Sequence, residues 1–233
     1  MKRSLLALAL LSAYGLAQAD VTGNFGLTTD YRFRGISQTQ NGAAVQGGFD
    51  YTHESGFYAG TWNSSVSTEL FPGGSGLESD WYAGYKKDVY KGVTIDVGSY
   101  NYIYPKTTNK FDTYELYAGV AYGPVSGKVS YSLNDYFGIS DSKGTTYSQL
   151  DVAYPVVDKL TAKAHVGRTA VDGSSSLNYT DYNVGVVYDY KGYNLGATYY
   201  INDNYGSEAR SFNTVNDKKL YKDSVVLSVV KYF

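Results

Sequence analysis

Hydrophobic and polar residues alternate along most of the chain. From Val21 to Phe33 the odd positions are mostly apolar or aromatic, whereas the even positions from Thr22 to Arg34 are polar or glycine. Side chains of a β-strand point alternately to its two faces, so this pattern predicts a long strand with one apolar face. The alternation recurs and predicts about twelve strands, near 21–34, 45–52, 57–67, 77–86, 93–104, 113–122, 125–136, 149–154, 160–167, 181–189, 193–202 and 224–233.

The connections between these segments alternate between short and long. The short set covers 52–56, 88–92, 122–127, 155–159 and 189–193, and the long set covers 36–42, 67–76, 105–110, 138–145, 171–179 and 202–221. Bacterial outer-membrane barrels have an even number of strands, short periplasmic turns and longer extracellular loops. We therefore predict an all-β fold, an antiparallel transmembrane β-barrel of about twelve strands.

The stretch Thr29–Gly35 shows what this fold implies for side chains. In it Asp30, Arg32 and Arg34 alternate with Tyr31 and Phe33. In a membrane barrel the rings face lipid and the charges face a wet lumen, and this is the orientation we expect. A soluble sandwich would reverse the two faces, because a period of two does not say which face is wet.

Aromatic residues near the short turns favour the membrane alternative. Amphipathic rings collect at membrane interfaces. The expected interface belt consists of Tyr51, Tyr58, Tyr85, Tyr122, Tyr154, Tyr188 and Phe233. The closing Phe233 also resembles the C-terminal signature by which bacterial barrels engage the outer-membrane assembly machinery, which makes that machinery an expected partner together with outer-membrane lipid.

The first residues predict export. A basic start at Lys2 and Arg3, an apolar run over 5–11 and the sequence Ala17-Gln18-Ala19 are typical of a cleaved signal peptide. We expect a signal peptide over 1–19 and a single barrel domain over 20–233, located in the outer membrane of a Gram-negative bacterium. The chain has no cysteine and a net charge of only −2, so neither disulfides nor a nucleic-acid partner is expected.

Charged residues on the polar phase are the candidate functional residues. They could form salt bridges that fill the barrel, or they could line a constriction that selects ions, as rings of charged side chains do in channels. Arg32 and Arg34 are the favoured selectivity residues, with Asp50 as a candidate partner. The candidate lumen-lining residues are Asp30, Arg32, Arg34, Asp50, Asp80, Glu115, Lys128, Asp151 and Lys163.

Other chemistry has little support in the sequence. The inward tyrosines Tyr82, Tyr100, Tyr102, Tyr117 and Tyr200 could stack sugars or nucleosides, or simply fill space. The two histidines, His53 and His165, have no spacing that indicates a Ser–His–acid arrangement. We expect no enzyme activity, no cofactor and no metal site.

A resemblance supports the same fold. The stretches TDYRFRGISQT (29–39) and VQGGFDYTHESGFYAGTW (45–62) resemble the TorF-type porin family of proteobacterial outer-membrane β-barrels. The resemblance implies an outer-membrane barrel and implies no substrate. The expected function is passive diffusion of ions or small polar solutes through a charge-lined lumen. The alternative is a closed structural or adhesive barrel that acts through its extracellular loops.

Overall fold

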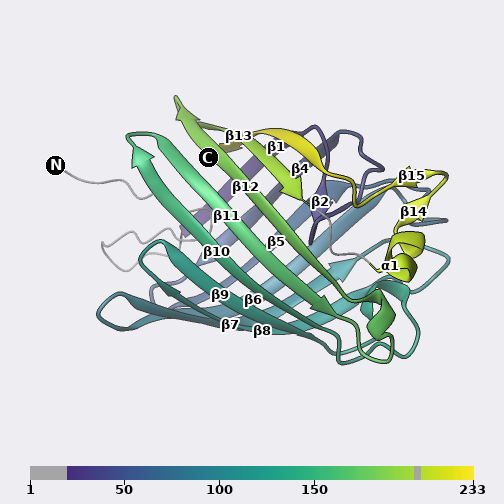
Figure 1. Ribbon diagram of the computed structural model, residues 1–233. Coiled ribbons are helices and arrows are strands. Elements are labelled where there is room, and N and C mark those ends of the chain that lie inside the picture. The colour runs from purple at the N-terminus through teal and green to yellow at the C-terminus, as the bar shows by residue number, and fades with distance from the viewer. Residues whose placement is uncertain (1–19, 202–205) are drawn as a thin grey trace.

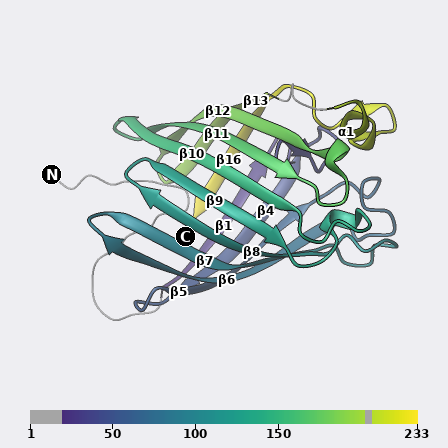
Figure 2. The ribbon, with the colours of Figure 1, turned by 60° about the horizontal axis from the view of Figure 1, so that its bottom comes forward.

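The alternating segments pair with their neighbours in the chain, and in the computed structural model the resulting sheet closes on itself (Figure 1, Figure 2). The structure describes residues 20–201 and 206–233, so the expected signal peptide lies outside the described residues. The twelve barrel strands are β1 (Asp20–Thr28), β4 (Ala44–Thr52), β5 (Phe57–Ser65), β6 (Leu77–Tyr90), β7 (Val93–Ile103), β8 (Thr113–Tyr122), β9 (Val125–Ser132), β10 (Thr146–Val157), β11 (Leu160–Ala170), β12 (Tyr179–Tyr190), β13 (Tyr193–Ile201) and β16 (Ser224–Tyr232). The predicted strand number and antiparallel barrel are confirmed.

The barrel closes between its first and last strands. β1 pairs with β4 on one side and with β16 on the other, where Asn24 lies opposite Tyr232. At the end of this seam the amide of Gly23 donates to the Phe233 carbonyl at 2.8 Å, and the Phe233 amide donates back to Gly23 at 3.0 Å. A closed sheet has no free edge, so all strands have two neighbours to satisfy their backbone groups.

Short turns collect at one end of the barrel and long loops at the other (Figure 1). The turns span 53–56, 91–92, 123–124, 158–159 and 191–192. In the last, Lys191 and Gly192 have φ angles of 54° and 80°, as two-residue hairpin turns require. The long loops are L1 (29–43), L2 (66–76), L3 (104–112), L4 (133–145), L5 (171–178) and L6 (202–223).

The loops carry short elements of their own. L1 contains the two-residue strands β2 (Arg32–Phe33) and β3 (Ile36–Ser37), and L4 and L5 contain the 3-10 turns η1 (Tyr136–Gly138) and η2 (Ser175–Leu177). L6 contains helix α1 (Ser207–Phe212) and strands β14 (Thr214–Val215) and β15 (Lys218–Lys219). No helix among the described residues is long and apolar enough to cross a membrane.

The two faces of the barrel wall differ as the alternation predicts. Outward residues such as Phe49 and Leu150 are 56% and 49% exposed, whereas the inward Glu78 and Asp80 are each 1% exposed. An apolar outer band around a polar interior is the reverse of a soluble sandwich, and it is the arrangement of membrane barrels.

Inward tyrosines pack over glycines. A Cβ added to Gly60 would lie 2.6 Å from the Tyr82 ring on the adjacent strand, so this ring needs a wall position without a side chain. The glycine leaves room for the ring to lie along the wall. The same relation holds for Tyr58 over Gly84, Tyr117 over Gly98 and Tyr147 over Gly167.

The predicted course of the first strand is wrong beyond Thr28. β1 ends there, and L1 turns into the barrel instead of continuing along the wall. Tyr31 is 8% exposed and its ring packs edge-on against Trp62 at 5.2 Å, so it faces the interior and not the outer surface. Phe33 likewise packs against Tyr102 and Phe137. The sequence still alternates through β2, but here the rings pack against other aromatic side chains inside the mouth of the barrel. The alternation of a single strand does not predict such contacts with distant residues.

One residue of the expected interface belt also faces inward. Tyr58 donates to Asp96 at 2.6 Å and is hydrogen-bonded to the Tyr117 hydroxyl. Its neighbour Phe57 takes the outward position, 61% exposed and edge-on to Tyr85. Because two aromatic residues are adjacent here, the alternation alone could not assign the phase of β5. The other belt positions are on the outward phase: Tyr51, Tyr85, Tyr122, Tyr154 and Tyr188, with the exposed Phe233 at the seam.

The tyrosine–glycine packing gives a first prediction. In Gly167→Ala the new Cβ would overlap the Tyr147 hydroxyl and approach Asp181, so the ring must leave its place. We expect the free energy of unfolding, measured by urea titration of the refolded barrel, to fall by about 1–3 kcal/mol. Gly127→Ala is the control, because the nearest atom to its Cβ is 3.6 Å away. Equal stability of the two variants would show that Tyr147 does not need a glycine at position 167 to pack against the wall.

Candidate functional site

The candidate site is the interior of the barrel together with L1. Eight carboxylates on the inward phase or in L1 face five arginine and lysine side chains and His165. The strand register places the strand residues of both groups on the inner face. The carboxylates are Asp30, Asp50, Glu78, Asp80, Asp96, Glu115, Asp151 and Asp181, and the basic residues are Arg32, Arg34, Lys86, Lys128 and Lys163.

Tyrosine hydroxyls satisfy several of the inward carboxylates. Tyr82 donates to Asp50, and Tyr100 donates to Asp80 at 3.2 Å. Tyr82 and Tyr100 are themselves stacked, with ring centroids 5.0 Å apart. A neutral donor satisfies a carboxylate without placing a positive charge beside it.

Glu78 and Asp80 form the most enclosed pair. They lie two positions apart on β6, and Glu78 accepts from Tyr31 at 2.6 Å and from Tyr104 at 2.7 Å. Burial, followed by the charge of Glu78, raises the pKa of the Tyr31 hydroxyl well above its usual value, so Tyr31 stays a neutral donor. One oxygen of Asp80, Oδ1, is buried without a hydrogen-bond partner in the described structure.

His165 joins two aspartates on the opposite wall. Its Nδ1 is 2.6 Å from Asp151 and its Nε2 is 3.1 Å from Asp181, with the Tyr147 hydroxyl 2.9 Å from Nε2. Both ring nitrogens face carboxylates, so the cluster suits a protonated imidazolium that holds β10, β11 and β12 together. In acyl transfer the second nitrogen faces a serine or cysteine nucleophile, and here it faces Asp181 and Tyr147.

Arg34 fixes L1 inside the barrel. Its Nη1 donates to Glu115 Oε1 at 2.9 Å and its Nη2 donates to Oε2 at 2.7 Å, a bidentate pair in which the side chains are 6% and 2% exposed. Nη1 also donates to the Tyr136 hydroxyl at 3.0 Å, and the guanidinium lies 4.2 Å from the centroid of the Tyr147 ring. One L1 side chain thus reaches the wall strands β8 and β10 and the loop L4. We call the Arg34–Glu115 pair the latch.

The neighbours of Arg34 stabilise its charged form. Burial alone would lower the pKa of Arg34, but Tyr136 and Glu115 outweigh burial and raise that pKa well above its ordinary value. Charge-assisted bidentate bonds are stronger than neutral hydrogen bonds. The backbone at Arg34 has a φ of 48°, which turns the chain back toward β3.

Arg32 is neutralised within L1. Its Nε donates to Asp30 Oδ2 at 2.8 Å, and its Nη1 donates to the carbonyls of Gly35 and Lys222. The side chain of Arg32 is fully buried. Ser37 donates to the other oxygen of Asp30, so the pair holds the base of the β2–β3 hairpin and ties it to L6.

The structure brings some of the predicted residues together and separates others. The expected partnership of Asp50 with Arg32 or Arg34 is wrong, because Asp50 is bonded to Tyr82, Arg32 to Asp30 and Arg34 to Glu115. Lys128 lies 5.3 Å from the centroid of the Tyr117 ring, and Lys163 lies opposite Ala153 on the inner face. Asp50 and Tyr82, like Arg34 and Glu115, lie far apart in the sequence. The spacing of residues along the chain therefore could not predict these pairs.

The sequence did not reveal the cluster of aromatic side chains at the mouth. Tyr31, Phe71, Tyr102 and Tyr104 are buried there. Partly buried rings of five loops or strands pack against them: Phe33, Trp62, Tyr100, Phe111 and Phe137. The high tyrosine content, 27 residues, was the only sequence signal, and it does not say which rings meet. Among the residues that the structure describes, no three His, Cys, Asp or Glu side chains are grouped to hold a metal ion.

The latch gives a second prediction. Arg34→Ala leaves the carboxylate of Glu115 buried without its cation, which should cost about 3–5 kcal/mol of unfolding free energy. Amide hydrogen exchange over 29–43 should accelerate in the same variant. The matched control is Arg168→Ala, since Arg168 is exposed and bonded only to Thr180 among the contacts found.

A double substitution separates charge from packing. Arg34→Met combined with Glu115→Leu removes both charges and keeps apolar volume, so it should recover most of the stability that Arg34→Ala loses. If the double variant is as unstable as Arg34→Ala, the unpaired Glu115 charge is not the cause of the loss.

Comparison with solved structures agrees with the observed fold. The KdgM porin superposes with a TM-score of 0.57 at 10% identity, covering 91% of this chain and 98% of that chain. The NanC porin gives 0.55 at 11% identity, covering 92% and 100%. An active-site mutant of outer membrane phospholipase A from Escherichia coli gives 0.50 at 12% identity, covering 96% and 94%. At these identities the likeness concerns the barrel fold.

Comparison by sequence gives the family. None of the curated proteins matches the chain. A family model matches residues 13–233 and is described as a bacterial protein of unknown function (Gcw_chp). The comparisons thus support the β-barrel fold and do not supply the TorF name. The chain, with a match that spans the whole barrel, belongs to the Gcw_chp family.

Proposed function

We propose that this protein is a porin-like channel of the bacterial outer membrane, through which ions or small polar solutes diffuse. The observation that carries the proposal is the inner face of the closed barrel, where carboxylates, lysines and tyrosine hydroxyls line the wall while apolar side chains cover the outside. A polar interior of a barrel this size suits water and small solutes. The barrel likeness to the KdgM and NanC porins supports the same function. The proposal includes no catalytic step.

The charge balance of the lumen favours cations. Asp30 neutralises Arg32 and Glu115 neutralises Arg34. Three lysines and His165 then share the inner face with six further carboxylates, Asp50, Glu78, Asp80, Asp96, Asp151 and Asp181. The buried neighbours Glu78 and Asp80 carry one negative charge between them, so five negative charges face four positive ones. An excess of fixed negative charge raises the local concentration of cations and lowers that of anions.

Ion selectivity tests this balance. In a planar bilayer with a salt gradient, the refolded barrel should give a reversal potential of the sign that indicates cation preference. Asp50→Asn should reduce that potential, because it removes an inward charge whose donor Tyr82 is neutral. Asp158→Asn, at an exposed short turn, is the control and should leave the potential nearly unchanged. Anion preference in the unaltered barrel would overturn the assignment.

The alternative, a closed barrel that acts through its loops, has one specific observation in its favour. L1 enters the mouth, where Tyr31 and Arg34 are buried against the wall and L4. A loop in this position narrows the lumen at the long-loop end. Whether current flows therefore depends on how firmly the latch holds L1.

Opening of the latch separates the two functions. Arg34→Ala should raise single-channel conductance, by about twofold or more, because L1 loses its anchor to β8 and L4. Arg168→Ala again serves as the control. Steps of unchanged size in Arg34→Ala would mean that L1 does not limit the current. A barrel that inserts and stays silent in both forms would favour the closed alternative.

A further inference from the structure

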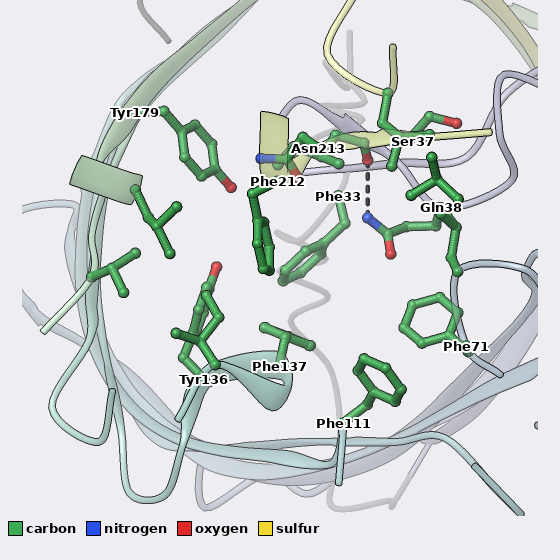
Figure 3. Close-up of a pocket in the computed structure, with 17 residues that line it drawn as sticks. Phe33, Ser37, Gln38, Phe71, Phe111, Tyr136, Phe137, Tyr179, Phe212 and Asn213 are labelled. Atoms are coloured by element: carbon green, nitrogen blue, oxygen red, sulfur yellow. Dashed lines mark hydrogen bonds between the residues drawn. The ribbon is translucent and has the colours of Figure 1, made fainter. Parts of the chain in front are cut away.

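The mouth of the barrel contains a partly open, mainly apolar cavity between the long loops (Figure 3). All six loops contribute to its wall, and its volume is about 180 Å³. The rings of Phe33, Phe71, Phe111, Phe137 and Phe212 surround it, one from each of five loops (Figure 3). Phe212 is 55% exposed, so the cavity reaches the surface of the protein beside α1.

The loops around the cavity are tied to one another. The Ser37 amide of L1 donates to the Leu220 carbonyl of L6 at 2.9 Å, and the Ser67 amide of L2 donates to Gln38 at 2.9 Å. The Thr108 amide of L3 donates to Pro72 of L2 at 2.9 Å. These backbone bonds fix the loops relative to one another, so the cavity is part of the folded loop structure.

A side-chain contact at the rim strengthens these ties. Glu69 of L2 accepts from Gln40 of L1 at 2.8 Å and from Asn216 of L6. These two hydrogen bonds, first that of Gln40, lower the pKa of Glu69 below its usual value. L1, L2 and L6 therefore meet at one carboxylate outside the cavity.

Several polar groups of the wall already have partners. Ser37 donates to Asp30, the side-chain amide of Gln38 donates to the Ile36 carbonyl, and the Tyr136 hydroxyl accepts from Arg34. Within 20–201 and 206–233, no Asp, Glu, Lys, Arg or His lines the cavity. Most of what remains for a ligand is apolar and aromatic surface, which does not compensate an ionic charge.

We infer that this cavity is a binding site for an uncharged molecule with a single aromatic ring. An apolar cavity of about 150 Å³ holds benzene in another protein, so the size fits one ring and not two. The surrounding phenylalanines can meet a ring edge-on, as Phe33 and Phe137 already meet each other at 5.4 Å. Burial of about 150 Å² of ring surface corresponds to a Kd on the order of 1 mM.

The cavity lies next to the loop L1, which narrows the lumen. Phe33 lines the cavity and precedes Arg34 in L1, so a bound ring touches the loop that the latch holds. Binding itself needs no current through the barrel. The inference therefore stands independently of the proposed channel function, and a silent barrel leaves it intact.

Binding of toluene to the refolded mature chain tests the inference. With methyl groups labelled with ¹³C, toluene should shift the signals of Ile139, Val171 and Leu177 in the wall, with a saturable dependence near 1 mM. Leu116 and Leu150, exposed on the outer face, report partition into detergent. Benzoate, which has the same ring and a carboxylate, should leave the wall signals unshifted at the same concentration.

Two variants locate the site. Val171→Phe fills the cavity and should weaken toluene binding at least tenfold, whereas the outward Val129→Phe should leave it unchanged. If Val171→Phe does not fold, Phe212→Ala removes an exposed wall ring and should weaken binding severalfold. Linear shifts of equal size at the wall and outer methyl groups would show partition only and overturn the inference. Saturable binding that folded Val171→Phe retains would overturn it as well.

Discussion

Closure of the sheet is the constraint on which the remaining structure depends. In a twelve-strand barrel each strand must be bonded on both sides, and β1 completes this by pairing with β4 and β16. Once the sheet is closed, each side chain of a barrel strand points either outward or into the interior. The inward places are few and crowded, so charge, ring size and glycine positions there have to match one another.

Tyrosine is well suited to this crowded interior. Its ring fills space and its hydroxyl satisfies a carboxylate without neutralising it, as Tyr82 does for Asp50 and Tyr31 for Glu78. A lysine in the same place would cancel the charge and require more water. Glycine on the next strand lets the ring lie along the wall, as Gly60 does for Tyr82. The abundance of both residue types in the chain follows from this pairing.

Much of the fold could be predicted from the sequence, because alternation and loop length are local signals. The strand number, the order of short turns and long loops, and the inward phase of Asp80, Glu115 and Asp151 were all available from them. The candidate site was less accessible. Arg34 pairs with Glu115, 81 residues away, and no local pattern encodes that distance. Tyr31 and Phe33 show the same limit, since the alternation continues through them although the wall strand has ended at Thr28.

The latch also has a consequence for the order of assembly. The hydrogen-bond partners of Arg34 in β8 and L4 lie 81 and 102 residues further along the chain. The bonds of Arg34 need L1 and the segment from β8 to L4 to be present together. The constriction therefore depends on this part of the wall being in place. A barrel that lacks this segment has no anchor for Arg34, so L1 is fixed in the mouth only when the wall strands far from it in sequence have come round to meet it.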